Sequence, residues 1–282
     1  MPDINSFGFI GGDKRQLYCA ASAADDGYGV YLYGFDQCGS SAGTECASLS
    51  EMAKKCDAII LPLPVTKDGI TVNAPLSDEK IELNESFWKL FDSKPVFCGM
   101  KNRLHHDGKL LFDYATREEF AVDNAVPTSE GAIAIAMREY DGTVNGSRCL
   151  VTGYGRIGRI LSKMLCGLGA DVTVSARNLR DLAFIRADGM RAVNTCALEE
   201  KYDLIFNTVP AMVFDAHTLA RTAVNALVID LASAPGGVDY EAAKRLSIKA
   251  VHALSLPGKA APKSAGIIIK NAVYNMIREE KL

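Results

Sequence analysis

A glycine-rich segment in the middle of the chain is the clearest indication of chemistry. A strand predicted at Arg148 to Thr152 runs directly into Gly153-Tyr154-Gly155-Arg156-Ile157-Gly158, which opens a helical pattern. In such a unit Gly153 permits the tight turn, Gly155 lets the backbone approach a pyrophosphate, and Gly158 lets the helix pack closely on the sheet. Backbone amides at the start of the helix would then hold the phosphates. The pattern predicts a dinucleotide site, and the alternative is a purely structural glycine turn.

The end of the next strand indicates which dinucleotide is bound. A strand predicted at Asp171 to Ser175 is followed by Ala176-Arg177-Asn178. Proteins that bind NAD place an Asp or Glu here, about 20 residues after the glycine motif, to bind the ribose hydroxyls. No acid stands at this point, and Arg177 could pair with a 2′-phosphate while Ser175 or Asn178 donates further hydrogen bonds. NADP is therefore predicted, unless Arg177 is an ordinary solvated side chain.

Two more strand ends carry polar residues in the same half of the chain. They are Asn207-Thr208-Val209-Pro210 and Asp230-Leu231-Ala232-Ser233. Ligands of open parallel sheets bind outside the carboxyl ends of the strands. The first segment would line the nicotinamide-ribose side of the site. The second precedes Pro235-Gly236-Gly237, a turn that brings backbone close to a ligand, although ordinary loop chemistry would explain both.

The first half of the chain offers a different loop. Phe9-Ile10-Gly11-Gly12-Asp13-Lys14-Arg15-Gln16 places glycines and charges between a strand and a helix, but it lacks the three-glycine spacing of a dinucleotide site. We expect a substrate-facing loop in which Arg15 holds a carboxylate and Asp13 acts as a base or orients Arg15. Asp13 is equally suited to be a helix cap. Lys259, in a loop expected at Leu256 to Pro262, is a second candidate anion ligand.

Short apolar runs alternate with amphipathic stretches, which indicates an α/β protein built on parallel sheets. With 282 residues and about 100 to 200 residues per domain, two domains are expected. The first domain is expected at 1–126. The second is expected at 127–264 and is a Rossmann NADP-binding domain. A helix at 265–282 is expected to pack back on the first domain. A connecting helix should begin near Thr128. Strands are predicted at Phe7 to Ile10, Val30 to Tyr33, Ala58 to Leu61, Pro95 to Cys98, Arg148 to Thr152, Asp171 to Ser175, Leu204 to Asn207, Ala226 to Leu231 and Ile248 to Val251.

Composition excludes several classes of function. Lys plus Arg total 31 against 34 Asp plus Glu, so the basic excess of a nucleic-acid-binding protein is missing. Apolar runs such as Ala58 to Leu61 are too short for a membrane span. The segment from Met1 to Asn5 lacks the features of a signal peptide, and the 8 cysteines show no paired spacing, so a reducing cytoplasm is expected. His105, His106, His217 and His252 show no ligand spacing, and no metal is predicted.

These motifs together resemble the family of dipicolinate synthase A subunits from spore-forming bacteria, over nearly the whole chain. The glycine loop is shared by many dehydrogenases, whereas the blocks near the two ends of the chain are more specific. Departures from the family pattern are Ser264 in place of Thr and Tyr154 in place of Phe. The resemblance is carried by Gly11 to Gln16, Pro127 to Ala132, Gly153 to Gly158, Ser175 to Arg177 and Leu256 to Gly266.

The resemblance implies a flavodoxin-like α/β domain followed by a Rossmann domain, in a plan similar to formate and glycerate dehydrogenases. It implies oxidation of a dihydrodipicolinate-level intermediate of the lysine pathway to dipicolinate during sporulation, with hydride passing to NADP. The implied partner is a flavoprotein-like B subunit, and the substrate is a small dicarboxylate. Arg15, Lys259 and the start of the Thr128 helix are the groups expected to hold it, with Asp13 beside them. A homo-oligomer is expected because dimers are common.

Two competing interpretations stay open. A dehydrogenase of D-2-hydroxy acids would need an Arg after the strand ending at Asp230 and a catalytic His. Ala232 and Ser233 follow that strand instead, and His252 has no obvious acidic partner. The other alternative is a non-catalytic NADP-binding subunit that regulates a partner, for which tight cofactor binding without hydride transfer is expected.

Overall fold

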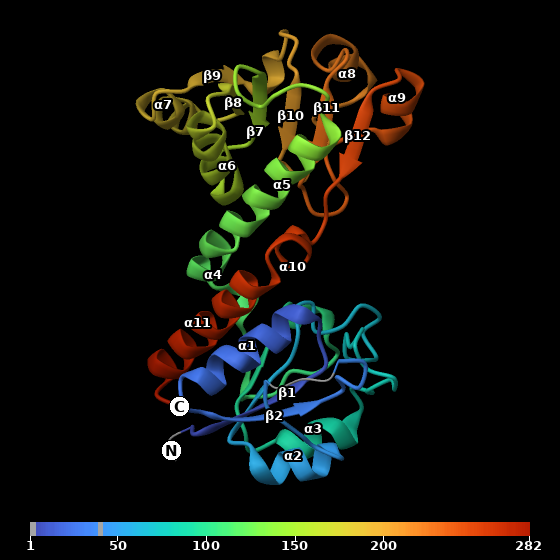
Figure 1. The fold of residues 1–282 in the computed structure, drawn as a ribbon, viewed down its shortest axis with the longest axis vertical. Coiled ribbons are helices and arrows are strands. Elements are labelled where there is room, and N and C mark those ends of the chain that lie inside the picture. The colour runs from blue at the N-terminus through green and yellow to red at the C-terminus, as the bar shows by residue number, and fades with distance from the viewer. Residues whose placement is uncertain (1–3, 39–41) are drawn as a thin grey trace. The chain divides into compact units, whose positions relative to one another are not determined.

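The computed structural model describes residues 4–38 and 42–282, so the first three residues of the amino-terminal segment considered above lie outside it. The chain divides into two compact units (Figure 1). One contains the residues up to Asn124 together with Ala261–Leu282, and the other is Ala125–Ala260. Within the described ranges, no helix combines the length and the apolar character that crossing a membrane requires.

The first unit is a parallel sheet with helices on both faces. Its six strands lie in the order β3-β2-β1-β4-β5-β6. Without the two-residue edge strand β3, this is the flavodoxin-like order 2-1-3-4-5. The strands are β1 (Ser6–Ile10), β2 (Gly29–Tyr33), β3 (Thr44–Glu45), β4 (Ala58–Ile60), β5 (Val96–Cys98) and β6 (Leu111–Asp113). The helices are α1 (Lys14–Asp25), α2 (Leu49–Lys55), α3 (Glu85–Phe91), α4 (Glu118–Asp123) and α11 (Pro262–Glu280), with short 3-10 turns η1 (Lys101–Arg103) and η2 (Tyr114–Thr116).

An apolar layer lies between each face of the first sheet and the helices that cover it. Phe7 and Phe9 pack against α1, α4 and α11 on one face, and Ile59 and Leu61 pack against α2 and α3 on the other. The β1 side chains alternate between the two layers, as the pleat of a strand buried on both faces requires.

The second unit has the Rossmann strand order. Its six strands lie in the order β12-β11-β10-β7-β8-β9, which is 6-5-4-1-2-3 when they are counted within the unit. The fold class predicted from the sequence is thus confirmed. The strands are β7 (Arg148–Thr152), β8 (Asp171–Ala176), β9 (Arg191–Asn194), β10 (Leu204–Asn207), β11 (Leu227–Asp230) and β12 (Lys249–His252). The helices are α5 (Ala125–Glu139), α6 (Arg156–Gly167), α7 (Leu179–Ala187), α8 (Ala216–Thr222), α9 (Tyr240–Arg245) and α10 (Leu256–Ala260), with a 3-10 turn η3 (Thr195–Ala197).

Helices α5 and α10 differ from the sequence prediction. Helix α5 begins at Ala125 rather than near Thr128, and Thr128 is buried inside it. Proline lacks an amide hydrogen but is tolerated in the first helical turn, so Pro127 does not delay the helix. The helix start expected at Thr128 for anion binding therefore does not exist there. For the same reason Leu256–Ala260 forms helix α10 with Pro257 in its first turn, where a rigid loop was expected.

Helix α11 packs on α1 within the first unit (Figure 1). Gly266 makes this packing possible, because a Cβ at that position would lie 2.4 Å from the Arg15 carbonyl oxygen and 2.8 Å from the Cys19 amide nitrogen. One turn further along, the buried Lys270 donates to Asp26 Oδ2 at 2.5 Å. The returning helix is thus fixed by a close backbone approach and an ion pair, and it packs on the backbone that presents Arg15.

Candidate functional site

The glycine loop between β7 and α6 has the geometry of a phosphate cradle. Gly153 has φ +91°, a left-handed conformation that favours glycine. A Cβ at Gly158 would lie 2.1 Å from the Gly153 carbonyl oxygen, so the close approach of helix and loop requires glycine there. Nothing lies within 4 Å of the position that a Cβ of Gly155 would take. Gly153 and Gly158 are thus required by the conformation and packing of the loop. The open space beside Gly155 is where a pyrophosphate would fit.

A pocket of about 410 Å³ adjoins this loop and is formed by the ends of β7, β8, β9 and β10. Its volume is within the range of small-molecule sites. Of the residues predicted from the sequence, it brings together Gly153, Tyr154, Ala176, Arg177, Asn178 and Val209. It also contains seven residues that the sequence did not predict, namely Asp181, Thr195, Cys196, Ala211, Met212, Val213 and Thr218. These come from α7, from α8 and from the segments after β9 and β10, which the sheet order brings to the same place.

Arg177 is the cation of this pocket. Its side chain is exposed and makes no hydrogen bond or ion pair with any residue in the described ranges, so it is available to an anionic ligand. Asp181, which the structure places in the same pocket, is already engaged, because its carboxylate accepts a hydrogen bond from Asn178 Nδ2 at 2.7 Å. A helix-capping pattern, Asn followed three residues later by an acid, was the sequence signal for it.

The other predicted phosphate ligands have internal partners. Asn178 caps α7, with Oδ1 accepting from the Asp181 amide at 2.7 Å. Ser175 is fully buried and accepts a hydrogen bond from the Thr195 hydroxyl at 3.1 Å. Both side chains thus take part in bonds that shape the pocket, and Ser175 is in addition fully buried. Arg177 is left as the principal partner for such a phosphate.

The polar residues at the ends of β10 and β11 form a buried network. Asn207 donates to Asp230 Oδ1 at 2.8 Å and accepts from the Thr152 hydroxyl at 2.6 Å. Asp230 also accepts from the Gly237 amide and the Tyr240 hydroxyl, both at 3.0 Å. The side chains of Asn207 and Asp230 are fully buried. They act as structural supports that hold the strand ends and the following turn in place.

The remaining predicted cofactor residues are spread around these supports. The Thr208 hydroxyl donates to the Thr152 carbonyl at 2.7 Å and stands beside Gly153. Leu231 and Ala232 are buried, and Pro210 is exposed. Arg156 and Ile157 form the first turn of α6, where Arg156 is exposed and Ile157 is half-buried.

The loop after β1 occupies the point of the first sheet where the strand order reverses, since β1 pairs with β2 on one side and β4 on the other. Such a point is the usual ligand site of an open parallel sheet. Arg15 donates from Nε at 2.9 Å and from Nη2 at 2.8 Å to Asp13, and from Nη2 to the Leu63 carbonyl at 2.5 Å. Asp13 also caps α1. Capping and orientation, which the sequence left as alternatives, are both realised.

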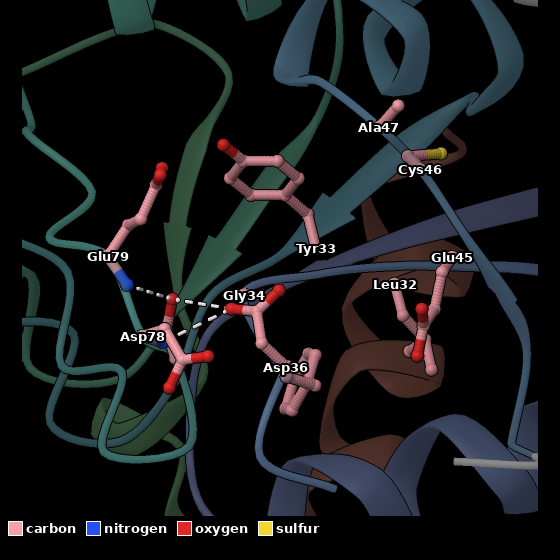
Figure 2. A pocket seen from close by; sticks show the side chains of 11 residues that line it. Leu32, Tyr33, Gly34, Asp36, Glu45, Cys46, Ala47, Asp78 and Glu79 are labelled. Atoms are coloured by element: carbon pink, nitrogen blue, oxygen red, sulfur yellow. Dashed lines mark hydrogen bonds between the residues drawn. The ribbon is translucent and has the colours of Figure 1, made fainter. Parts of the chain in front are cut away.

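A larger pocket of the first unit, of about 600 Å³, is acidic (Figure 2). Asp36, Glu45, Asp78 and Glu79 line it, and Asp36 Oδ2 accepts hydrogen bonds from Ser77 Oγ at 3.1 Å and from the Asp78 amide at 3.2 Å. Burial, with the charges of Glu79 and Asp36, raises the pKa of Tyr33 in the same wall. A dicarboxylate would be repelled here, so the Arg15 loop is the better place in this unit for such a molecule.

Cys196 provides a direct test of whether the pocket of the second unit takes a dinucleotide. Cys166 and Cys196 are both exposed, but only Cys196 lines the pocket. At NADPH concentrations ten times its dissociation constant, alkylation of Cys196 by iodoacetamide should slow by about tenfold, while Cys166 reacts at an unchanged rate. Mass spectrometry of the two peptides measures both rates in one sample. Equal labelling of Cys196 with and without NADPH would contradict the placement.

Comparison with known proteins relates both parts of the chain to known families. Residues 6–107 match the family model of the N-terminal domain of the dipicolinate synthase A subunit, and residues 115–243 match that of the D-isomer specific 2-hydroxyacid dehydrogenase NAD binding domain. The chain is 33% identical to the A subunit of dipicolinate synthase from Bacillus subtilis (strain 168), over 96% of this chain and 95% of that protein.

Solved structures show the same relationship. The A chain of dipicolinate synthase from Bacillus subtilis superposes with a TM-score of 0.86 at 32% identity, covering 100% of this chain and 98% of that one. The A subunit from Bacillus halodurans gives 0.84 at 32% identity, covering 97% of each chain. A transhydrogenase from Sinorhizobium meliloti, with a TM-score of 0.64 at 13% identity over 96% and 92% of the chains, shares the fold. The chain therefore belongs to the family of dipicolinate synthase A subunits and carries the nicotinamide-binding domain of a dehydrogenase.

Proposed function

We propose that this protein is the NADP-dependent dehydrogenase subunit of a dipicolinate synthase, and that it oxidises a dihydrodipicolinate-level intermediate of the lysine pathway to dipicolinate during sporulation. The observation that carries the cofactor assignment is Arg177. It lines the pocket beside the open space at Gly155 and has no hydrogen-bond or ion-pair partner among the described residues. Membership of the family supports the substrate, because the relatives are named dipicolinate synthase.

The reaction removes one hydride and one proton from the dihydropyridine ring, and the products are dipicolinate, NADPH and a proton. When bound, the nicotinamide accepts the hydride. Formation of the aromatic ring supplies the driving force. The chain itself must bind two carboxylates and orient the ring, which calls for cationic groups held in fixed positions.

Arg15 is the best-placed group for one carboxylate. Its side chain is only 12% exposed, and Asp13 and the Leu63 carbonyl hold it through Nε and Nη2. Nη1 makes no hydrogen bond within the described part of the chain and can donate to an anion. Since the Asp13 carboxylate accepts hydrogen bonds from the amide and guanidinium of Arg15, we assign it the role of orienting Arg15 rather than that of a free base. Lys259, exposed on α10, is the proposed second anion ligand.

Arg15→Ala and Lys259→Ala are expected to raise the KM for the dicarboxylate by about 10- to 100-fold each, because each removes a charge-assisted hydrogen bond. The dissociation constant of NADPH should stay unchanged. Lys14→Ala, at the exposed neighbour of Arg15, is the control and should leave KM as it is. Steady-state kinetics measure the effect, and an unchanged KM in both variants would remove these residues from the substrate site.

The function itself is tested with freshly prepared intermediate. The purified protein receives the intermediate with NADP or with NAD, in the presence and absence of a B subunit, and the ultraviolet absorbance of dipicolinate is followed. Faster formation of dipicolinate with NADP supports the proposal. Binding of NADPH without turnover, even with the B subunit present, would instead identify a non-catalytic regulatory subunit.

The match to the 2-hydroxyacid dehydrogenase domain favours a second candidate, a D-2-hydroxy acid dehydrogenase. The segment after β11 argues against it. Ala232 and Ser233 stand where that activity would need an arginine, and Asp230 is buried in bonds to Asn207, Gly237 and Tyr240. We therefore expect no reduction of NADP or NAD with D-2-hydroxy acids, and turnover of such an acid would reverse the preference.

A further inference from the structure

Tyr154 stands between the two glycines that shape the phosphate cradle, yet its side chain points into the protein. It is 4% exposed, and its hydroxyl donates a hydrogen bond to Asp188 Oδ2. Asp188 is the C-cap residue of α7, which belongs to a different βα unit from the loop. A side chain in the middle of a turn that binds phosphate through its backbone is therefore attached to a separate helix.

A second residue ties down the same part of the loop. Arg159, in the first turns of α6, donates from Nε to the Tyr154 carbonyl oxygen at 3.1 Å, and its guanidinium lies over the Tyr154 ring at 4.9 Å from the centroid. The same guanidinium lies 5.6 Å from the ring centroid of Phe184 on α7. Backbone, ring and hydroxyl of Tyr154 are thus each held by a different contact.

The surroundings of Tyr154 and Asp188 keep the hydroxyl protonated and the carboxylate ionised. The hydrogen bond from Tyr154, with Lys163 Nζ at 3.6 Å, holds the pKa of Asp188 below its ordinary value. Burial, with the neighbouring Asp188 carboxylate, raises the pKa of Tyr154 to about 12. The hydroxyl is a donor and the carboxylate an acceptor throughout the neutral range, so the bond persists under working conditions.

We propose that Tyr154, through its bonds to Asp188 and Arg159, is a positioning residue that pre-organises the glycine loop for the pyrophosphate of the dinucleotide. Glycine has more conformational freedom than any other residue, so a turn built on Gly153 and Gly155 would lose much entropy when it closes on a ligand. Fixing the residue between them lowers that cost before the ligand arrives. The inference rests on the proposed dinucleotide function. Tyr154 would act in it indirectly, by holding the loop whose backbone binds the pyrophosphate.

The test separates the pyrophosphate from the rest of the ligand. Tyr154→Phe keeps the ring and removes the hydroxyl, and Asp188→Ala removes its acceptor. Each is expected to raise the dissociation constant of NADPH by about three- to tenfold, the effect of one net hydrogen bond, and the double variant should be no weaker than the stronger single one. Adenosine 2′-phosphate, which reaches Arg177 but has no pyrophosphate, should bind all variants as it binds the parent protein. Isothermal titration measures both ligands.

Tyr202→Phe is the matched control. Tyr202 is a buried tyrosine of the same unit that hydrogen-bonds Thr173, away from the glycine loop, and its loss should not change NADPH binding. Unchanged NADPH affinity in both Tyr154→Phe and Asp188→Ala would overturn the proposal, and so would an equal loss of adenosine 2′-phosphate binding, which indicates general loosening. Failure of the parent protein to bind NADPH or NADH would overturn the dinucleotide function together with this inference.

Discussion

Replacing Gly155 by valine is expected to abolish dinucleotide binding while leaving the fold intact. The backbone at Gly155 has φ −81° and ψ −161°, which any residue can adopt, and nothing lies within 4 Å of the new Cβ. The melting temperature should therefore stay close to that of the parent. The valine side chain would fill the space into which the pyrophosphate must come. Loss of those charge-assisted contacts should weaken NADPH by about 100-fold or more, as measured by fluorescence titration.

Gly167→Val provides a control at the other end of the same helix. Gly167 also has nothing within 4 Å of the position that a Cβ would take, but it lies far along α6 from the phosphate loop. The same substitution there should leave NADPH affinity unchanged. If Gly155→Val binds NADPH as tightly as the parent, the open space above Gly155 does not hold a phosphate and the cofactor placement is wrong.

Arg177→Ala is expected to remove the preference for NADPH over NADH. Arg177 is the cation that lines the pocket without an internal partner among the described residues, so its charge is free to pair with a 2′-phosphate. Loss of that pair should weaken NADPH by about 10- to 100-fold, whereas NADH, which lacks the phosphate, should change little. Arg177→Glu should weaken NADPH further, because it places a negative charge beside the phosphate and next to Asp181.

Arg180→Ala is the matched variant for this prediction. Arg180 is exposed, lies on the first turn of α7 and pairs with Asp181 at 3.5 Å, but it does not line the pocket. The Arg180→Ala variant should keep the preference for NADPH over NADH. Equal loss of NADPH and NADH affinity in Arg177→Ala would show that Arg177 contacts a part common to both cofactors, and NADP specificity would have to be abandoned.

Local sequence patterns were sufficient to predict the glycine loop and, among the described residues, every strand except β3, β6 and β9. The strands Arg148–Thr152 and Leu204–Asn207 lie where the apolar runs place them, because strands buried on both faces of a parallel sheet are short continuous apolar segments. The roles of Gly153 and Gly158 also follow from spacing alone. A strand, a tight turn and a helix packed on that strand are specified within about 20 residues of sequence.

The rest of the pocket depends on contacts between distant segments. Thr195 and Cys196 follow β9, an edge strand of four residues that no apolar run marks in the sequence. Their position beside Arg177 comes from the strand order, which places β9 next to β8. Asp181 lies only four residues beyond Arg177, but its side chain reaches the pocket because the helix starts at Leu179.

Polar residues at strand ends were the hardest to interpret from sequence. Asn207 and Asp230 have the residue types and positions of cofactor ligands, but in the structure they bond to each other and to the turn after β11. Residue type shows that a side chain can form hydrogen bonds, and only the packed structure shows with what. Asp13 illustrates the same limit, because a helix cap and a partner for Arg15 require the same carboxylate.

The most direct test of the central claim follows the hydride itself. The intermediate is prepared with deuterium at its saturated ring carbons and incubated with NADP, the protein and the B subunit of a dipicolinate synthase. We expect dipicolinate and NADPH to form in equal amounts and the NADPH to carry the deuterium, as mass spectrometry of the recovered cofactor would show. Formation of dipicolinate with no deuterium in the cofactor would mean that the ring is oxidised by another route, and that this protein is not the dehydrogenase.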